Sequence, residues 1–136
     1  MARVLAIDPG SRRCGVAISD SARTMAFPRA ALAAEGVVAA VVRLVENEGV
    51  DLVVVGRPVA LSGAETASTT QADELVADLR GGLGAVPVVA FDERLTTTEA
   101  QRSLREAGVR ARHHRGRVDS AAAVVMLQHF LEADRA

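Results

Sequence analysis

The chain lacks most of the residues that specify disulfide scaffolds and base-stacking surfaces. It has one cysteine, three Phe, and no Trp, Tyr or Lys. The single cysteine, Cys14, excludes an internal disulfide framework, suits a reducing cytoplasm, and is expected to be a small apolar strand residue. Without Trp or Tyr, base stacking is not expected to dominate any nucleic-acid recognition. No apolar run approaches the ~20 residues of a membrane-spanning helix, so no membrane partner is expected.

What is present is a chain of single-domain length, 1–136, in which 49% of the residues are apolar and the net charge is −1. The basic residues are unevenly distributed. Residues 94–117 hold seven Arg and two His against two acids, Glu99 and Glu106. Such a basic stretch suits contacts with phosphate groups, although a solvated helix face and loop has the same composition.

Apolar runs and turn residues predict an α/β domain. We expect strands near 3–8, 14–19, 24–32, 52–55 and 86–91. Helical spacing predicts helices around 38–45, 72–79, 96–107 and 119–132, the first three ending at Gly49, at Gly81-Gly82 and at Gly108.

The order of these elements predicts a mixed five-stranded sheet with helices on its faces. The first two strands are joined by a short link, which indicates an antiparallel hairpin. Pro28 places the third strand near an edge of the sheet.

Three acids stand where such a fold places chemistry. Asp8 ends the first apolar strand, Glu93 follows the strand at 86–91, and Asp119 opens the last helix on the side of its apolar stripe. A carboxylate at the rim of a core is costly unless a cation or hydrogen bonds compensate it. If the two strands are neighbours, Asp8 and Glu93 lie close together. Such an oxygen-only set suits Mg²⁺ or Mn²⁺, and two such ions support phosphodiester cleavage by a bound water.

Each acid also has a simpler interpretation. Asp8 could cap the turn that follows it. Asp119 could be only the N-cap of its helix. Asp92 could replace Glu93 as the ligand, because strand alternation puts only one of the two on the site face.

Four ordered motifs then resemble those of the YqgF (RuvX) family. They are Ile7–Asp20, Val54–Pro58, Asp92–Thr97, which closely matches the D-E-R-L-T-T signature of the family, and Val118–Ala123, which resembles its D-S-x-A-A motif. The resemblance implies an RNase H-like fold related to RuvC-type Holliday-junction resolvases. It also implies a Mg²⁺-dependent nuclease of the bacterial cytoplasm that matures the 5′ end of the small-subunit rRNA precursor, pre-16S rRNA.

The resemblance assigns metal-binding, catalytic roles to Asp8, Glu93 and Asp119, and places Arg94 beside the scissile phosphate. The Lys-rich loop of many relatives is Arg-rich here, which keeps the charge. The expected contacts with a nucleic-acid backbone are Arg12, Arg13, Arg94, Arg110, Arg112, Arg115 and Arg117.

The expected partner is structured RNA or branched DNA, and a junction resolvase would require a homodimer. Three other functions remain open at this point. One is a Holliday junction resolvase or DNA repair nuclease, and another is a non-catalytic nucleic-acid-binding module. The last is one half of an actin-like or sugar-kinase-like ATP site, which requires two such domains.

Overall fold

A mixed five-stranded sheet forms the centre of the computed structural model, which describes residues 3–58, 62–92 and 120–135. The strands are β1 (Arg3–Asp8), β2 (Arg13–Ser19), β3 (Ala26–Ala33), β4 (Val50–Arg57) and β5 (Val88–Asp92). Their order is β3-β2-β1-β4-β5. β2 runs antiparallel to both β1 and β3, whereas β1, β4 and β5 are parallel. The predicted hairpin, mixed sheet and edge position of the Pro28 strand are therefore confirmed.

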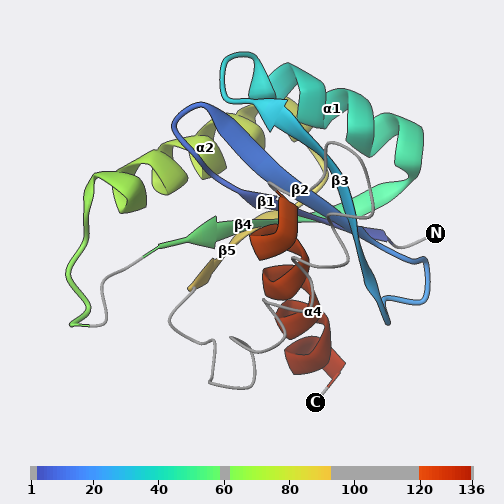
Figure 1. Cartoon of the computed structure of the whole chain (residues 1–136). Coiled ribbons are helices and arrows are strands. Elements are labelled where there is room, and N and C mark those ends of the chain that lie inside the picture. The colour runs from blue at the N-terminus through green and yellow to red at the C-terminus, as the bar shows by residue number, and fades with distance from the viewer. Residues whose placement is uncertain (1–2, 59–61, 93–119, 136) are drawn as a thin grey trace.

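Helices cover both faces of this sheet (Figure 1). α1 (Val37–Glu48) and α2 (Ala67–Leu83) lie on one face, and α4 (Ala121–Arg135) lies on the other. The helix predicted at 96–107 and the basic stretch at 94–117 fall outside the described residues. Within the described part of the chain, no helix is both long enough and apolar enough to span a membrane.

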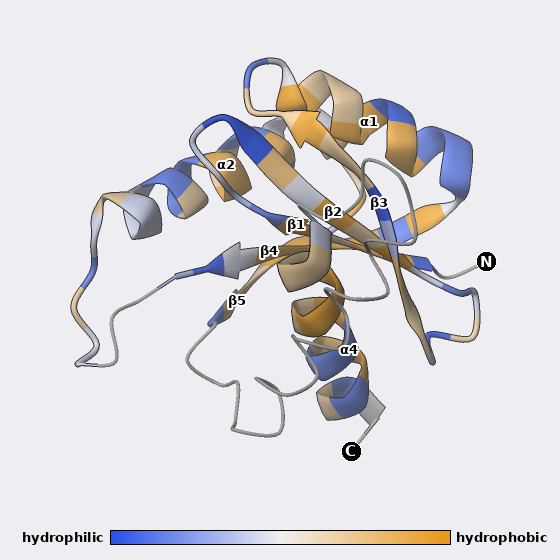
Figure 2. Ribbon diagram, in the orientation of Figure 1, coloured by the Kyte–Doolittle hydropathy of each residue, from blue (hydrophilic) through white to orange (hydrophobic). Residues whose placement is uncertain are grey.

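Strand alternation divides the core into two clusters. In β1, Leu5 and Ile7 pack toward α1 and α2, whereas Val4 and Ala6 pack toward α4. All four are fully buried, as expected of a central strand. The apolar stripe predicted for the last helix meets the second cluster, with Ala123, Met126 and Leu127 buried and Phe130 partly buried. Figure 2 shows this apolar side of α4 against the sheet and hydrophilic residues toward its far end.

The predicted end of the second helix at Gly81-Gly82 is wrong. α2 continues through both glycines to Leu83, and Gly84 caps it with a φ of 60°. At Gly82 the helix lies against α1, where an added Cβ would stand 3.1 Å from Cγ1 of Val38. The glycine therefore permits two helices to approach closely, and it does not stop the helix.

β3 begins at Ala26, two residues later than predicted, because a turn held by Asp20 precedes it. The Asp20 carboxylate accepts hydrogen bonds from the backbone N–H of Thr24 at 2.7 Å and of Met25 at 3.1 Å, and from the Thr24 hydroxyl. These bonds lower the pKa of Asp20 to about 2, with the Thr24 hydroxyl as the largest cause. Local side-chain bonding thus competes with strand pairing at this point.

Candidate functional site

Three parallel strands end at one edge of the sheet. β1 ends at Asp8, β4 at Arg57 and β5 at Asp92, and β4 lies between the other two. The condition under which the sequence places Asp8 and Glu93 close together is not met, because the two strands are not neighbours. With neighbouring strands about 4.8 Å apart, β1 and β5 are about 9–10 Å apart at this edge.

Asp8 is the one predicted ligand that the described residues include. It follows Val4 and Ala6 on the face toward α4, and it is partly buried opposite Gly15 of β2. Burial raises the pKa of the Asp8 carboxyl above its ordinary value. Within the described parts of the chain, no hydrogen bond or ion pair reaches its side chain. A partly buried carboxylate in this position is a group that a cation would stabilise.

β4 presents no side chain next to Asp8 on this face. Ile7 pairs with Val55, so the following position along β4 is Gly56, which pairs with Phe91 of β5. Gly56 is buried, and alternation from Val54 directs it toward α4. The β4 residue nearest to Asp8 on the α4 face is therefore a glycine.

Asp92 faces the opposite side of the sheet. Val88 packs in the α1–α2 cluster, whereas Val89 and Phe91 pack toward α4, so Asp92 shares the face of Val88. Its partner in the ladder, Arg57, also points to that side. The structure therefore does not bring Asp92 to the face that carries Asp8, which disfavours the alternative in which Asp92 is the ligand.

Arg57 is held by acids of α2 and of the segment before it. Its Nε donates to Oδ1 of Asp73 at 2.8 Å, and its Nη2 bonds Glu65. The hydrogen bond with Asp73 is the largest cause of the raised pKa of Arg57, and the same contact lowers the pKa of Asp73. This arginine is thus engaged in a surface ion-pair network at the end of β4.

Ser120, at the start of α4, is a buried polar residue that sequence reasoning missed. Its hydroxyl accepts a hydrogen bond from the N–H of Val16 at 2.9 Å and donates one to the carbonyl oxygen of Arg29 at 2.6 Å. Val16 is the neighbour of Gly15, the residue opposite Asp8. A serine that directly follows an acid at the start of an apolar helix was the available signal.

The β1–β2 turn and the start of β2 carry two of the predicted nucleic-acid contacts, Arg12 and Arg13, and both are exposed. The turn needs glycine, because a Cβ on Gly10 would lie 2.2 Å from the carbonyl oxygen of Arg13. From α2, Nε2 of Gln71 donates a hydrogen bond to the carbonyl oxygen of Gly10 at 2.9 Å. The segment that follows Asp8 is thus held from the α2 side.

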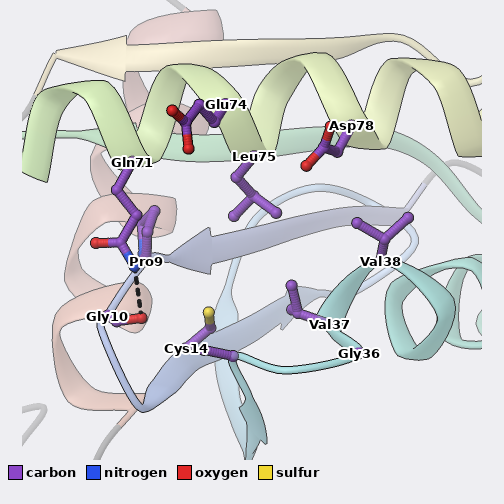
Figure 3. Close-up of a pocket in the computed structure, with 11 residues that line it drawn as sticks. Pro9, Gly10, Cys14, Gly36, Val37, Val38, Gln71, Glu74, Leu75 and Asp78 are labelled. Carbon is purple, nitrogen blue, oxygen red and sulfur yellow. Dashed lines mark hydrogen bonds between the residues drawn. The ribbon is translucent and has the colours of Figure 1, made fainter.

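A pocket of about 320 Å³ lies under this turn, between α1 and α2 (Figure 3). Its lining includes Val37, Leu75, Glu74 and the buried Cys14, whose side chain points into it. Burial is the largest cause of the raised pKa of the Cys14 thiol, consistent with its expected role as a small apolar strand residue. The pocket lies on the face opposite Asp8, so it is not part of the predicted site.

The other predicted site residues lie outside the described residues. These are Glu93, Asp119, Arg94, Arg110, Arg112, Arg115 and Arg117. Across 3–58, 62–92 and 120–135, no group of three His, Cys, Asp or Glu side chains is arranged to hold a metal ion. The metal assignment therefore rests on Asp8 and on the elements that lead to the other two acids.

The sequence matches known proteins over nearly its whole length. A family model described as "RuvX: Holliday junction resolvase" matches residues 2–133. A protein of Leifsonia xyli subsp. xyli named "Putative pre-16S rRNA nuclease" is 43% identical over 97% of this chain and 86% of its own. A protein of the same name from Chlorobaculum tepidum is 37% identical over 96% of this chain and 94% of its own.

The fold also matches a solved structure. Thermus thermophilus RuvC aligns over 98% of this chain and 96% of its own with a TM-score of 0.61 and 18% identity. The same protein in complex with a Holliday junction substrate aligns over the same shares with a TM-score of 0.60 and 19% identity. The expected RNase H-like fold, with its mixed five-stranded sheet, is thereby confirmed.

Proposed function

The chain belongs to the RuvX family, and we propose that it is a nuclease that hydrolyses phosphodiester bonds in structured RNA at the carboxyl edge of its sheet. Pre-16S rRNA is the proposed substrate because relatives about 40% identical over most of the chain are named "Putative pre-16S rRNA nuclease". The observation that carries the site is Asp8, a partly buried carboxylate beside Gly56 that no described residue neutralises.

The proposed ligands of a divalent metal are Asp8, Glu93 and Asp119. Carboxylate oxygens are the ligands that Mg²⁺ and Mn²⁺ prefer, and the raised pKa of Asp8 reflects burial that a cation would offset. Two such ions, when bound, supply a water of lowered pKa and charge stabilisation for the leaving oxygen. In this proposal the role of the chain itself is to hold the ions on the α4 face of the sheet.

Two features of the described residues support the other ligands. In β5 the side chains that pack toward α4 are Val89 and Phe91, and Glu93 is the next odd-numbered position. Asp119 is bonded directly to Ser120, whose hydroxyl is fixed beside the residue pair that contains Asp8. The facing of the odd-numbered β5 positions and the covalent link of Asp119 to Ser120 support the proposal that both acids act together with Asp8.

Arginines are the proposed contacts with the nucleic-acid backbone. Arg12 and Arg13 are exposed on the turn that follows Asp8, and Arg94, Arg110, Arg112, Arg115 and Arg117 would extend this basic surface. Guanidinium groups can bind phosphates in a bidentate manner. We place the activity in the bacterial cytoplasm, where a single buried thiol stays reduced.

A Holliday junction is the second candidate substrate, because the family description names a resolvase. Symmetric cleavage of a four-way junction requires two active sites, so this activity would require a homodimer.

Cleavage assays separate these functions. Wild type and Asp8→Asn are incubated with a 5′-extended 16S rRNA fragment and with a four-way DNA junction, in Mg²⁺, Mn²⁺ or EDTA. We expect wild type to cleave the RNA in either metal, and neither EDTA-treated protein nor the variant to cleave it. Cleavage of the junction alone would establish the resolvase. Equal cleavage by Asp8→Asn would refute the metal site.

A further inference from the structure

Ser120 bridges β2 and β3 by hydrogen bonds at a point where the pairing of the two strands is irregular. The register of the two strands shifts between Cys14 and Val16, and Val16 faces Arg29. The Ser120 hydroxyl stands between these two residues, accepting from the N–H of Val16 at 2.9 Å and donating to the carbonyl oxygen of Arg29 at 2.6 Å. One side chain of the α4 segment thus satisfies a backbone donor and a backbone acceptor on two different strands.

This contact fixes the start of α4 more tightly than apolar packing does. Ser120 is fully buried, and its two partners lie 104 and 91 positions away in the sequence. Apolar contacts such as those of Ala123 and Leu127 tolerate small shifts of a helix along the sheet, because they lack direction. Two directional hydrogen bonds from one oxygen do not tolerate such shifts.

The anchored point is adjacent to the proposed metal site. Asp8 pairs with Gly15, and the next pair along the hairpin is Ile7 with Val16, the residue that donates to Ser120. The residue bonded to Ser120 on its N-terminal side is Asp119. A displacement of Ser120 would therefore change the separation between two proposed ligands that belong to different elements.

We propose that Ser120 is a positioning residue that sets the affinity of the site for its divalent metal. Its hydroxyl fixes the start of α4 against the hairpin that carries Asp8, and Asp119 is covalently joined to this anchored residue. This inference rests on the proposed function, because Asp8 and Asp119 are the proposed ligands.

Ser19 provides a matched control for a purely structural role. It is also buried in the sheet, with 2% of its surface exposed. Its hydroxyl accepts from the N–H of Val4 at 2.8 Å and donates to the carbonyl oxygen of Asp20 at 2.9 Å. Ser19 lies at the far end of β2, away from Asp8. Loss of either hydroxyl leaves one buried N–H without its partner, so both alanine variants should be similarly destabilised.

The test compares Ser120→Ala and Ser19→Ala with wild type. Thermal unfolding measures the stability of each protein. Mg²⁺ titrations measure the apparent dissociation constant for Mg²⁺, both from single-turnover RNA cleavage and from the Mg²⁺-induced rise in Tm. We expect similar losses of Tm without metal for both variants. Only Ser120→Ala should raise the apparent dissociation constant for Mg²⁺. The expected rise is about tenfold, the size typical of residues that orient metal ligands. Ser120→Cys, with a weaker donor and acceptor, should give a smaller rise and replaces Ser120→Ala if that variant does not fold.

The outcomes separate this inference from the function on which it rests. If wild type shows neither Mg²⁺-dependent cleavage nor a Mg²⁺-induced rise in Tm, the proposed function fails and the inference fails with it. If wild type shows both Mg²⁺-dependent cleavage and the rise in Tm, but the Ser120 variant has the same apparent dissociation constant for Mg²⁺ as Ser19→Ala, then Ser120 is only a structural residue. In that case the inference alone is overturned.

Discussion

Asp8 and Asp92 end two parallel strands of one sheet but face opposite sides of it. Asp8 follows the side chains that pack toward α4, and Asp92 follows Val88, which packs toward α1 and α2. The Asp92 partner in the ladder, Arg57, is bonded to α2 through Asp73. Two acids that look equivalent in the sequence therefore have different surroundings.

This difference predicts opposite results for two matched variants. Asp8→Asn should lower Mg²⁺-dependent cleavage by more than about a hundredfold, which is the upper range for residues that only support a metal ligand. Asp92→Asn should keep activity within about threefold of wild type, because it removes a charge from the other face. Single-turnover cleavage at saturating Mg²⁺ measures both. An Asp92→Asn protein as inactive as Asp8→Asn would mean that the wrong acid has been assigned to the site.

Asp8 should also destabilise the metal-free protein at neutral pH. Its pKa is raised by burial, so the folded state binds the proton more tightly than the unfolded state. The stability from this group is fully present below the ordinary pKa of 3.8 and is lost as pH rises through the folded pKa. In EDTA at pH 7, Asp8→Asn should therefore melt at or above the wild-type Tm, and this advantage should shrink toward pH 4.

Mg²⁺ provides the control for that comparison. Because the ion binds the folded state, it should raise the Tm of wild type and leave that of Asp8→Asn unchanged. A lower Tm for Asp8→Asn in EDTA would show that the carboxylate has a stabilising partner in the protein.

The sequence predicts which face of the sheet a side chain occupies better than it predicts which strands lie next to each other. The continuous apolar run at 3–8 correctly indicated a buried strand, which is β1, and Pro28 correctly indicated an edge strand. Neither pattern states the lateral order of parallel strands, which is why the insertion of β4 between β1 and β5 was not foreseen. Alternation also left the choice between Asp92 and Glu93 open, because it needs the packing partners of Val88 and Phe91 to say which face is which.

Long-range contacts account for the other differences. Gly81-Gly82 is a typical helix terminator in sequence, but α1 approaches α2 at Gly82, and this approach is a tertiary feature. Ser120 carries no periodic signal, since its partners are backbone groups of β2 and β3 about a hundred residues away. Its role depends on the irregular register of those two strands.

Gly81 and Gly82 should respond differently to alanine. An added Cβ at Gly81 meets nothing within 4 Å, so Gly81→Ala should stabilise the protein by about 0.5–1 kcal/mol through helix propensity. At Gly82 the new Cβ would lie 3.1 Å from Cγ1 of Val38, and this crowding should cancel or reverse the gain. Urea unfolding of the two variants measures both free energies. Equal stabilisation would mean that α1 can move away from Gly82 at little cost.

Asp20 should give a pH dependence opposite in sign to that of Asp8. Its pKa is lowered to about 2, first by the Thr24 hydroxyl and then by backbone N–H groups of Met25 and Thr24. Stability from such a group is present above 3.8 and is lost as pH falls toward 2. Asp20→Asn should therefore melt below wild type at pH 6, and the difference should narrow between pH 4 and pH 2. A difference that stays constant over this range would exclude the carboxylate charge as its cause.

Arg12 and Arg13 should contribute to substrate affinity in a salt-dependent way, whereas Arg57 should not. Arg12 and Arg13 are exposed close to Asp8 in the chain, whereas Arg57 lies at the end of β4 on the opposite face of the sheet and contacts α2 through Asp73. Each phosphate contact adds about 0.7–0.9 to the slope of log K against log salt. The Arg12→Gln/Arg13→Gln double variant should therefore lower that slope by about 1.4–1.8 for the 5′-extended rRNA fragment. Binding is measured by fluorescence anisotropy in Ca²⁺ from 50 to about 300 mM salt, with Arg57→Gln as the control of matched chemistry. A slope reduced equally by Arg57→Gln would place the backbone path along β4 and α2, on the face opposite the proposed metal site.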